Sequence, residues 1–281
     1  MRGIEGKVAV VTGAARGLGA AAAARLGNLG AHVVAVDVNG EGAAAVVERL
    51  PVRGLAVQGD VSLEDDVVRY MKEAVAEFGG VDLHHLNAGV FGSFDALPDL
   101  SVAEFERVLR INVVGQFVGI REAFRRFAVQ GSSGAVVVTC SIAGLSGSAD
   151  LLPYQTSKHA LTGLVRGAAL YGGPLGVRVN GVAPGIVPTD LFEDSSTAQD
   201  AKDDMVLRAS TTPLRRAGTA EEIADAVAFL LSEDSTYVTG QIVSVDGGAT
   251  VVNTVRPSGG AGRWDPAALD DATYGPDRPE L

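Results

Sequence analysis

The segment "VAVVTGAARGLGA" (residues 8–20) decides the fold, because an apolar run changes directly into a glycine-rich turn and then into a stretch of small residues. Gly13, Gly17 and Gly19 form the pattern G-x-x-x-G-x-G. Glycines let the backbone turn sharply and approach a pyrophosphate, and the N-terminus of the next helix offers unpaired N–H groups and a positive dipole. Between a first strand and a first helix, this pattern predicts a dinucleotide-binding turn. A tight turn without a ligand is the alternative.

Outward from this segment, short apolar runs alternate with helix-like segments. Strand candidates are 7–11, 32–37, 55–61, 81–89, 133–141, 177–185 and 241–248. Helix candidates are 18–29, 40–50, 63–78, 103–127, 154–170 and 220–232. Apolar strands separated by helices are typical of a parallel sheet that is covered on both faces. The sequence therefore predicts an α/β fold, a single doubly wound Rossmann-type domain over residues 1–252 with about seven parallel strands and right-handed crossovers.

The last segment, 253–281, differs in composition, since it is rich in Pro, Gly and Asp and holds the single tryptophan, Trp264. Such a composition is typical of a disordered chain end. The alternative is an arm that packs Trp264 and Tyr274 on the body of the protein or at a subunit interface.

Charge and cysteine content limit the partners of the chain. The formal net charge is −11, which repels nucleic-acid phosphates and anionic lipid, and no Lys/Arg cluster offsets it. The single cysteine, Cys140, excludes an internal disulfide and fits a reducing compartment. The N-terminus has no signal-peptide pattern, and no apolar run is long enough to span a bilayer. We therefore expect a cytoplasmic protein with neither a nucleic-acid nor a membrane partner.

Asp37 ends the second predicted strand, at about the distance from the glycine turn expected for the acid that binds the adenosine ribose. Its carboxylate accepts hydrogen bonds from ribose hydroxyls and repels a 2′-phosphate, which favours NAD over NADP. Arg16 in the glycine turn favours NADP instead, because an arginine there suits a 2′-phosphate. Asp60 and Val61, after the third strand, are candidates for contact with adenine, although Asp60 alone is equally a helix N-cap candidate.

The segment "YQTSK" places Tyr154 and Lys158 one helical turn apart on one face of a predicted helix. An unperturbed phenol titrates near pH ~10, too high for a base at neutral pH. A nearby ammonium group and an oxidised nicotinamide ring both favour the phenolate and lower that pKa. A half-buried tyrosine beside a lysine with no chemical role is the alternative.

With these motifs in order, residues 4–250 resemble the short-chain dehydrogenase/reductase family. The matching pieces are "TGAARGLG", "GDV", "NAG" (87–89), Asn112 in "INVVG", Ser141, "YQTSK", "PGIVPT" (184–189) and "VDGG" (245–248). The resemblance implies an NAD(P)-dependent oxidoreductase with Asn112, Ser141, Tyr154 and Lys158 as catalytic residues. In it Tyr154 is the acid/base, Ser141 orients the substrate oxygen, Lys158 also holds the nicotinamide ribose, and Asn112 holds a water for proton relay.

The resemblance also implies a cofactor-binding set distributed along the chain: Gly13, Arg16, Gly17, Leu18, Gly19, Asp37, Asp60, Val61, Asn87, Ala88, Gly89, Tyr154, Lys158, Pro184, Gly185, Val187 and Thr189. One position departs from the family, which usually has Asn-Asn-Ala-Gly where this chain has Leu86 followed by "NAG". The change puts the hydrogen bonding of the local backbone in doubt. Neighbouring His84 and His85 have no Cys/His/Asp cluster near them in the sequence, so we expect no metal site.

We therefore expect an NAD-dependent alcohol dehydrogenase or ketoreductase that assembles as a homotetramer, as the resemblance implies, through helices at 103–127 and 154–170 and the last strand. The predicted substrate pocket is apolar and is made of Phe91, Ser141, Ile142, Leu151, Tyr154 and Leu191. Such a lining suits a hydrophobic cyclic, steroid- or terpenoid-like secondary alcohol, with the following polar segment as a lid. The alternatives are an NADPH-dependent ketoreductase and a non-catalytic dinucleotide-binding regulator.

Overall fold

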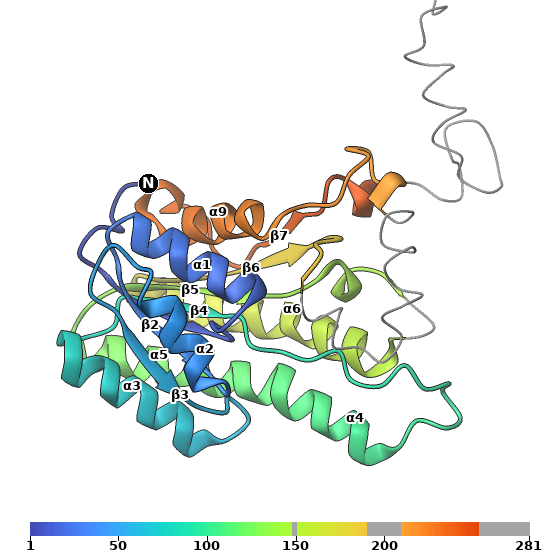
Figure 1. Ribbon diagram of the computed structural model, residues 1–281, viewed down its shortest axis with the longest axis horizontal. Coiled ribbons are helices and arrows are strands. Elements are labelled where there is room, and N and C mark those ends of the chain that lie inside the picture. Colours follow the sequence, from blue (N-terminus) through green and yellow to red (C-terminus); the bar gives the residue numbers. More distant parts are fainter. Residues whose placement is uncertain (148–150, 190–208, 253–281) are drawn as a thin grey trace, which may run out of the picture.

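A computed structural model describes residues 1–147, 151–189 and 209–252. Helices cover both faces of one sheet in this part of the chain, as Figure 1 shows. The predicted tail, 253–281, Leu191 and most of the predicted lid lie outside the described residues.

The sheet has seven strands, all parallel, in the order β3-β2-β1-β4-β5-β6-β7. The strands are β1 (Val8–Thr12), β2 (His32–Asp37), β3 (Leu55–Gln58), β4 (Leu83–Leu86), β5 (Gly134–Thr139), β6 (Val177–Pro184) and β7 (Ile242–Val245). The central residues of β1, β2, β5 and β6 are mostly apolar and buried, whereas β4 has two buried histidines at its centre and the edge strand β7 is partly exposed. The predicted doubly wound α/β fold is confirmed. The strand order reverses between β1 and β4, where such folds bind ligands at the carboxyl ends of the strands.

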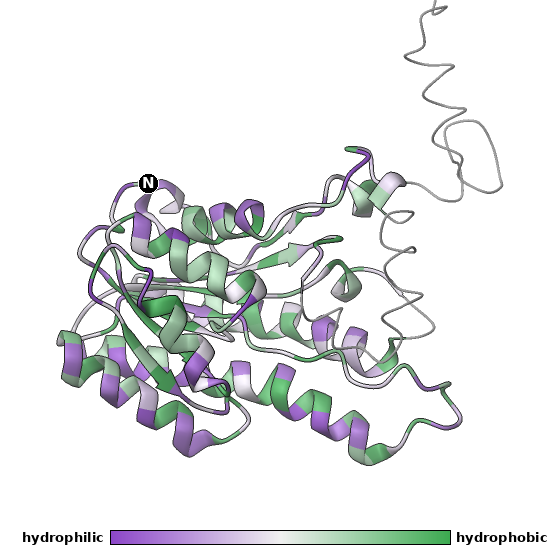
Figure 2. Ribbon diagram, in the orientation of Figure 1, coloured by the Kyte–Doolittle hydropathy of each residue, from purple (hydrophilic) through white to green (hydrophobic). Residues whose placement is uncertain are grey.

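One face of the sheet is covered by α1 (Gly17–Asn28), α2 (Gly40–Val47) and α9 (Ala220–Leu231). Small side chains allow close packing here, with Ala22, Ala23 and Leu26 of α1 buried against the strands. Thr219 caps α9 through a reciprocal pair of hydrogen bonds with Glu222. Hydrophobic residues concentrate on the strands and on the helix sides that face them (Figure 2).

The other face is covered by α3 (Glu64–Phe78), α5 (Gly115–Gln130) and α6 (Leu152–Gly172), and α4 (Val102–Leu109) packs against α6. The predicted long helix at 103–127 is present, but a π-helical turn, η1 (Arg110–Val114), separates α4 from α5. Such turns insert an extra residue into a helix and are frequent at functional sites. The turn centres on Asn112, one of the predicted catalytic residues.

Two buried histidines occupy the middle of the sheet on β4, with His84 and His85 pointing to opposite faces. His84 Nε2 lies 3.4 Å from the Tyr70 hydroxyl of α3, and His85 Nε2 lies 2.9 Å from Thr139 Oγ1 of β5. Burial lowers the pKa of each imidazole from its usual 6.5 to about 3. Both rings are therefore neutral in the native protein at neutral pH.

We predict that these two histidines destabilise the fold in mild acid. In the unfolded chain they gain protons below pH ~6.5, whereas in the native protein they gain them only near pH ~3, so stability is full above the unfolded pKa and falls as the pH drops between the two values. Between pH 7 and pH 5 each histidine should cost about 2 kcal/mol of unfolding free energy. Denaturant unfolding at both pH values measures this difference.

The matched variants for this prediction are His84→Leu and His159→Ala. His159 is exposed on α6 and should leave the acid loss as in the wild type. His84→Leu should reduce the loss between pH 7 and pH 5 by about 2 kcal/mol, whatever its effect on absolute stability. An acid loss that is the same in both variants would contradict the prediction.

Candidate active site

The glycine turn between β1 and α1 has the backbone shape that a pyrophosphate site requires. Gly13 and Gly17 adopt φ values of 65° and 55°, which other residues rarely adopt. A Cβ built on Gly19 would lie 1.9 Å from the carbonyl oxygen of Gly13, so only glycine fits there. Arg16, the exposed N-cap residue of α1, does not cap the helix with its side chain. The turn therefore presents the N-terminus of α1 to an anion.

Asp37, at the carboxyl end of β2, turns its carboxylate back to this glycine turn. One carboxylate oxygen accepts from the Ala15 N–H at 3.0 Å and the other from the Asn39 N–H at 2.9 Å. Each oxygen keeps a further lone pair. The carboxylate is thus fixed beside the turn and can still accept two hydroxyl groups.

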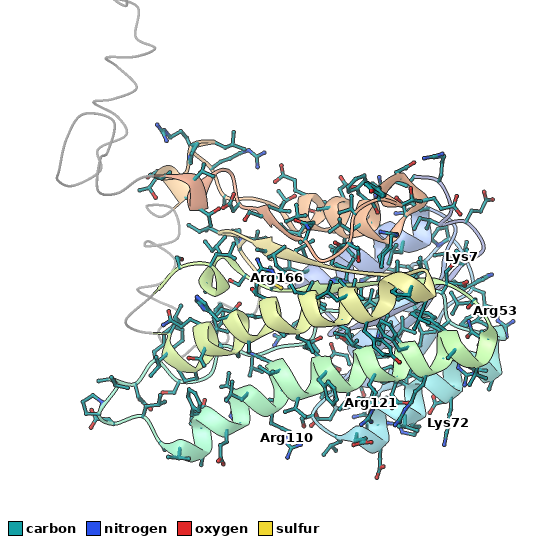
Figure 3. The ribbon with its side chains drawn as sticks, turned by 180° about the vertical axis from the view of Figure 1, so that it is seen from behind. Lys7, Arg53, Lys72, Arg110, Arg121 and Arg166 are labelled. Carbon is teal, nitrogen blue, oxygen red and sulfur yellow. The ribbon has the colours of Figure 1, made fainter. Side chains whose placement is uncertain are left out.

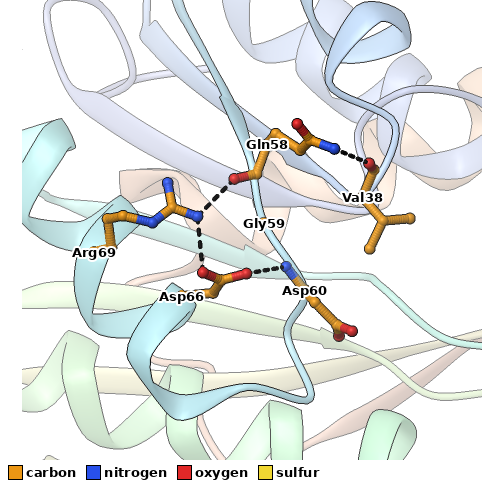
Figure 4. A pocket seen from close by; sticks show the side chains of 6 residues that line it. All are labelled: Val38, Gln58, Gly59, Asp60, Asp66 and Arg69. Carbon is orange, nitrogen blue, oxygen red and sulfur yellow. Dashed lines mark hydrogen bonds and ion pairs between the residues drawn. The ribbon is translucent and has the colours of Figure 1, made fainter.

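A pocket of about 240 Å³ follows beside the ends of β2 and β3 (Figure 4). Asp66 accepts from the Asp60 N–H at 2.8 Å, and Arg69 donates to Asp66 at 2.9 Å and to the Gln58 carbonyl at 2.8 Å. Asp60 is not the N-cap of α3, a role that Leu63 has. Its carboxylate accepts instead from the Ser62 N–H at 2.8 Å, at the edge of the pocket.

Asn87, after β4, is held on three sides by its neighbours in the sheet. Its N–H donates to Thr12 Oγ1 at 3.0 Å, its Nδ2 donates to the Gly13 carbonyl at 3.3 Å, and its Oδ1 accepts from Thr139 at 3.0 Å. The Ala88 N–H also donates to Thr12 Oγ1, at 3.2 Å. The structure thus brings the predicted "NAG" segment against the glycine turn.

Asn112 joins the loop after β4 to α6. Its Nδ2 donates to the Val90 carbonyl at 2.8 Å and to Ser157 Oγ at 3.0 Å, and its Oδ1 accepts from the Val90 N–H at 2.9 Å. A Cβ on Gly89 would lie 3.1 Å from Asn112 Oδ1 and 3.7 Å from Lys158 Nζ. The two polar groups therefore lie beside the same glycine. Both amide hydrogens are used, so a water at Asn112 would bond to one of its oxygens.

Ser141, Tyr154 and Lys158 meet beyond the carboxyl end of β5. Tyr154 and Ser141 share a hydrogen bond between their hydroxyl groups. The Lys158 ammonium lies 5.5 Å from the centroid of the Tyr154 ring and donates to the Thr139 carbonyl at 2.8 Å. The tyrosine is 8% exposed and the lysine 3% exposed. The four predicted catalytic residues, Asn112 included, are therefore brought together.

Burial decides the charge state of this pair in the protein alone. It raises the pKa of the Tyr154 phenol to about 12, although the bond to Ser141 lowers it. Burial also lowers the pKa of the Lys158 ammonium to about 8. In the protein alone, loss of solvation thus outweighs the bond to Ser141, and the lowering of the Tyr154 pKa by Lys158 and an oxidised nicotinamide stays a prediction. Tyr154 is a protonated phenol at neutral pH.

The segment after β6 returns to the glycine turn. Pro184 is the last residue of β6, and Gly185 N–H donates to the Val245 carbonyl at 3.0 Å. A Cβ on Gly185 would lie 2.6 Å from Asp246 Cα. Thr189 reaches the turn, since its Cβ would lie 3.6 Å from a Cβ on Gly17. Val187 between them is buried.

Two of the predicted substrate-pocket residues, Ser141 and Phe91, contact Tyr154. The Phe91 ring is buried, and its centroid lies 4.5 Å from that of Tyr154. Ile142 and Leu151 are partly buried on the segments that carry Ser141 and α6. Leu191 lies outside the described residues.

Leu86, the departure from the family pattern, is accommodated in the core. It is buried, and a Cβ on Gly119 of α5 would lie 2.4 Å from its Cδ2. Strand β4 pairs with β1 and β5 on its two sides. Leu86 itself pairs with Val138 of β5, and the N–H of the next residue, Asn87, donates to Thr12 Oγ1.

Three polar residues that the sequence did not single out support the site. Thr12 accepts from the "NAG" backbone, Ser157 accepts from Asn112 and donates to the Tyr154 carbonyl at 2.6 Å, and Thr139 bonds Asn87. The available signal was position, since Thr12 and Thr139 are polar residues that end otherwise apolar strands.

Within the described ranges, no group of three or more His, Cys, Asp or Glu side chains is arranged to hold a metal ion. The helices of those ranges include none with the length and apolar character needed to cross a bilayer. Cys140 is buried, and burial raises the pKa of its thiol to about 11.

Comparisons with known proteins agree on one family. A family model described as enoyl-(acyl carrier protein) reductase matches residues 13–250. Levodione reductase of Leifsonia aquatica is 37% identical over 250 residues, which cover 86% of this chain and 93% of that protein. Cis-4-hydroxycyclohexanecarboxylate dehydrogenase of Sinomonas cyclohexanicum is 41% identical, over 88% of this chain and 97% of that protein.

Solved structures give the same result. The crystal structure of levodione reductase superposes with a TM-score of 0.84 at 35% identity and covers 89% of this chain and 99% of its own. The crystal structure of NAD⁺-bound xylitol dehydrogenase superposes with a TM-score of 0.80 at 32% identity, over 88% of this chain and 100% of its own. Given a seven-stranded parallel sheet, a glycine turn and a Ser–Tyr–Lys centre as well, the chain belongs to the short-chain dehydrogenase/reductase family of oxidoreductases.

Proposed function

We propose that the protein is an NAD-dependent dehydrogenase or reductase that interconverts a cyclic secondary alcohol and its ketone. The observation that carries this proposal is the convergence of Ser141, Tyr154 and Lys158 at the carboxyl end of β5, next to Gly89 and the glycine turn. A non-catalytic protein that only binds a dinucleotide has no need of a buried phenol and a buried ammonium side by side.

The chain fits a dinucleotide by its own geometry. The turn at Gly13 and Gly17 would hold the pyrophosphate, Asp37 the adenosine ribose, and Asp60 with Val61 the adenine. Lys158 would hold the nicotinamide ribose. Further residues would line the nicotinamide: Asn87, Ala88, Gly89, Pro184, Gly185, Val187 and Thr189. The bound nicotinamide supplies or accepts a hydride.

The protein's own part in the reaction is to place the substrate oxygen and to move its proton. Ser141 would donate to the substrate oxygen and orient it toward Tyr154. Because the pKa of Tyr154 is about 12, this residue is ready to donate a proton to a ketone oxygen. For the reverse reaction its pKa must fall, which the charges of Lys158 and of an oxidised nicotinamide favour. Asn112 and a water would return the proton from Lys158 to solvent.

Two relatives support a cyclic substrate, and the Phe91 ring beside Tyr154 supports an apolar one. The buried Phe91 ring lies against the phenol, which favours an apolar ring over a charged sugar as the substrate. Two relatives are named for levodione and for a hydroxycyclohexane carboxylate.

The decisive experiment is Tyr154→Phe in an assay of alicyclic ketones and alcohols, sugars and acyl-carrier substrates. Loss of the proton donor should lower turnover of an alicyclic substrate by about 10²–10⁴-fold. His159→Ala, on the exposed side of α6, is the matched control and should keep turnover. Turnover of charged sugars or acyl-carrier substrates alone would contradict the substrate class. Unchanged turnover by Tyr154→Phe would instead favour a non-catalytic dinucleotide-binding regulator.

We predict that Asp37 makes the protein select NAD. Asp37→Asn keeps the size of the side chain and removes the charge that repels a 2′-phosphate. We expect kcat/KM with NADP to rise and kcat/KM with NAD to fall, each about tenfold, or about 1.4 kcal/mol. Asp37→Ala should relax selectivity in the same direction.

The matched variant is Arg16→Ala, because Arg16 is the residue of the glycine turn that suits NADP. If the protein is instead an NADPH-dependent ketoreductase, Arg16→Ala lowers turnover with NADPH and the Asp37 variants leave the cofactor ratio unchanged. Steady-state kinetics with both cofactors at several concentrations separate these outcomes.

We further propose a homotetramer in the cytoplasm. Large apolar side chains are exposed on the elements expected at its interfaces: Phe117 of α5, Leu170 and Tyr171 of α6, and Val243 of the edge strand β7. Light scattering should therefore give about four times the 28.8 kDa chain mass. A monomeric mass would contradict it. The buried thiol of Cys140 supports a reducing compartment, which cell fractionation would check.

A nucleic-acid partner is not supported by the basic residues. Figure 3 labels six lysine and arginine residues, which are spread over the molecule and do not form one patch: Lys7, Arg53, Lys72, Arg110, Arg121 and Arg166. Lys7 pairs with Asp82 at 3.2 Å, and Arg121 pairs with Glu64 at 2.5 Å. Their charge is thus partly neutralised by carboxylates.

A further inference from the structure

Thr139, the last residue of β5, makes three hydrogen bonds to three different parts of the site. Its hydroxyl lies 3.0 Å from Asn87 Oδ1 and 2.9 Å from His85 Nε2. Its backbone carbonyl accepts from Lys158 Nζ at 2.8 Å. Thr139 and His85 are both buried, so water cannot easily replace a lost partner.

The balance of donors and acceptors fixes the direction of these bonds. A threonine hydroxyl has one hydrogen, and Thr139 donates it to Asn87 Oδ1, an oxygen that cannot donate. Thr139 Oγ1 must then accept from His85, which is therefore a neutral imidazole with its hydrogen on Nε2. The two hydrogen bonds form a chain in which His85 donates to Thr139 and Thr139 donates to Asn87.

Asn87 extends this chain of hydrogen bonds to the glycine turn. Its Nδ2 donates to the Gly13 carbonyl at 3.3 Å, and a Cβ on Gly13 would lie 3.0 Å from the same nitrogen. If the amide were turned over, its oxygen would face the Gly13 carbonyl and its nitrogen would face the Thr139 hydroxyl. The hydrogen that Thr139 donates thus selects the amide orientation that binds Gly13.

We propose that His85 and Thr139 are positioning residues for the dinucleotide, which fix the Asn87 amide and through it the shape of the Gly13 turn. The proposal rests on the proposed function, since it takes the Gly13 turn as the cofactor site. Both side chains would act on the cofactor through the Asn87 amide. The bond to Lys158 comes from the backbone of Thr139 and does not need its side chain.

The test is a fluorescence titration of the purified full chain with NADH, together with steady-state kinetics. Thr139→Val keeps the shape of the side chain and removes the hydroxyl, and we expect the Kd for NADH to rise about tenfold. At saturating cofactor kcat should fall much less, because the backbone carbonyl still holds Lys158. Thr139→Ser should restore the wild-type Kd.

Variants of His85 test whether this residue donates the first hydrogen bond of the chain. His85→Val should raise the Kd about threefold, and His85→Gln, which keeps an N–H donor, should restore it in part. Because His85 acts only through Thr139, the double variant His85→Val, Thr139→Val should bind NADH no more weakly than Thr139→Val alone.

Val138→Ala is the matched control, since Val138 is an equally buried neighbour on the opposite face of β5. It should lower Tm and leave the Kd for NADH unchanged. A wild-type Kd in Thr139→Val, or an equal loss of binding in Val138→Ala, would overturn the proposal while leaving the proposed function intact. Failure of the wild-type chain to bind NADH would overturn the proposed function itself.

Discussion

The bonds between Thr12, Asn87 and Thr139 hold the carboxyl ends of β1, β4 and β5 together, and the site depends on this contact. The three strands are parallel, so their ends meet at one edge of the sheet. The strand order reverses between β1 and β4, which opens that edge to a ligand. The glycine turn leaves β1 here, and Ser141 follows β5. The residues proposed to bind the cofactor and those proposed to react are thus adjacent, because they follow neighbouring strands.

Burial shifts the pKa values of the two titratable groups in the proposed reaction centre. Burial opposes charge on both, so the phenol of Tyr154 keeps its proton with a pKa of about 12 and the ammonium of Lys158 loses part of its basicity. The buried residues that the structure describes include no carboxylate to offset this, and Lys158 donates to the Thr139 carbonyl. In the proposed reaction, alcohol oxidation would therefore need the charge of the bound cofactor to lower the pKa of Tyr154, which would link the chemical step to cofactor binding.

The strands, the helices and the placement of Tyr154 and Lys158 on one helix were predictable because their patterns are local. Apolar runs such as 8–12 and 134–139 predict buried strands, and the spacing of Tyr154 and Lys158 places them on one helix face. The strand order was not predictable, since it depends on pairing between distant segments. The π-helical turn at Asn112 was missed because a helical pattern does not reveal one inserted residue. The depth of burial of Tyr154, which raises its pKa in the protein alone, was not visible, because a sequence shows the neighbouring charge of Lys158 but not the loss of solvent.

The change from the family pattern at Leu86 is explained by the alternation of side chains along β4. His84 and Leu86 face the layer of α3 and α5, where His84 meets Tyr70 and Leu86 packs beside Gly119. His85 and Asn87 face the other way, toward the glycine turn and Thr139. Because successive residues of a strand point to opposite faces, an apolar residue at 86 cannot disturb the cofactor edge. The polar contact that supports that edge comes instead from His85, one residue earlier and on the face where it can act.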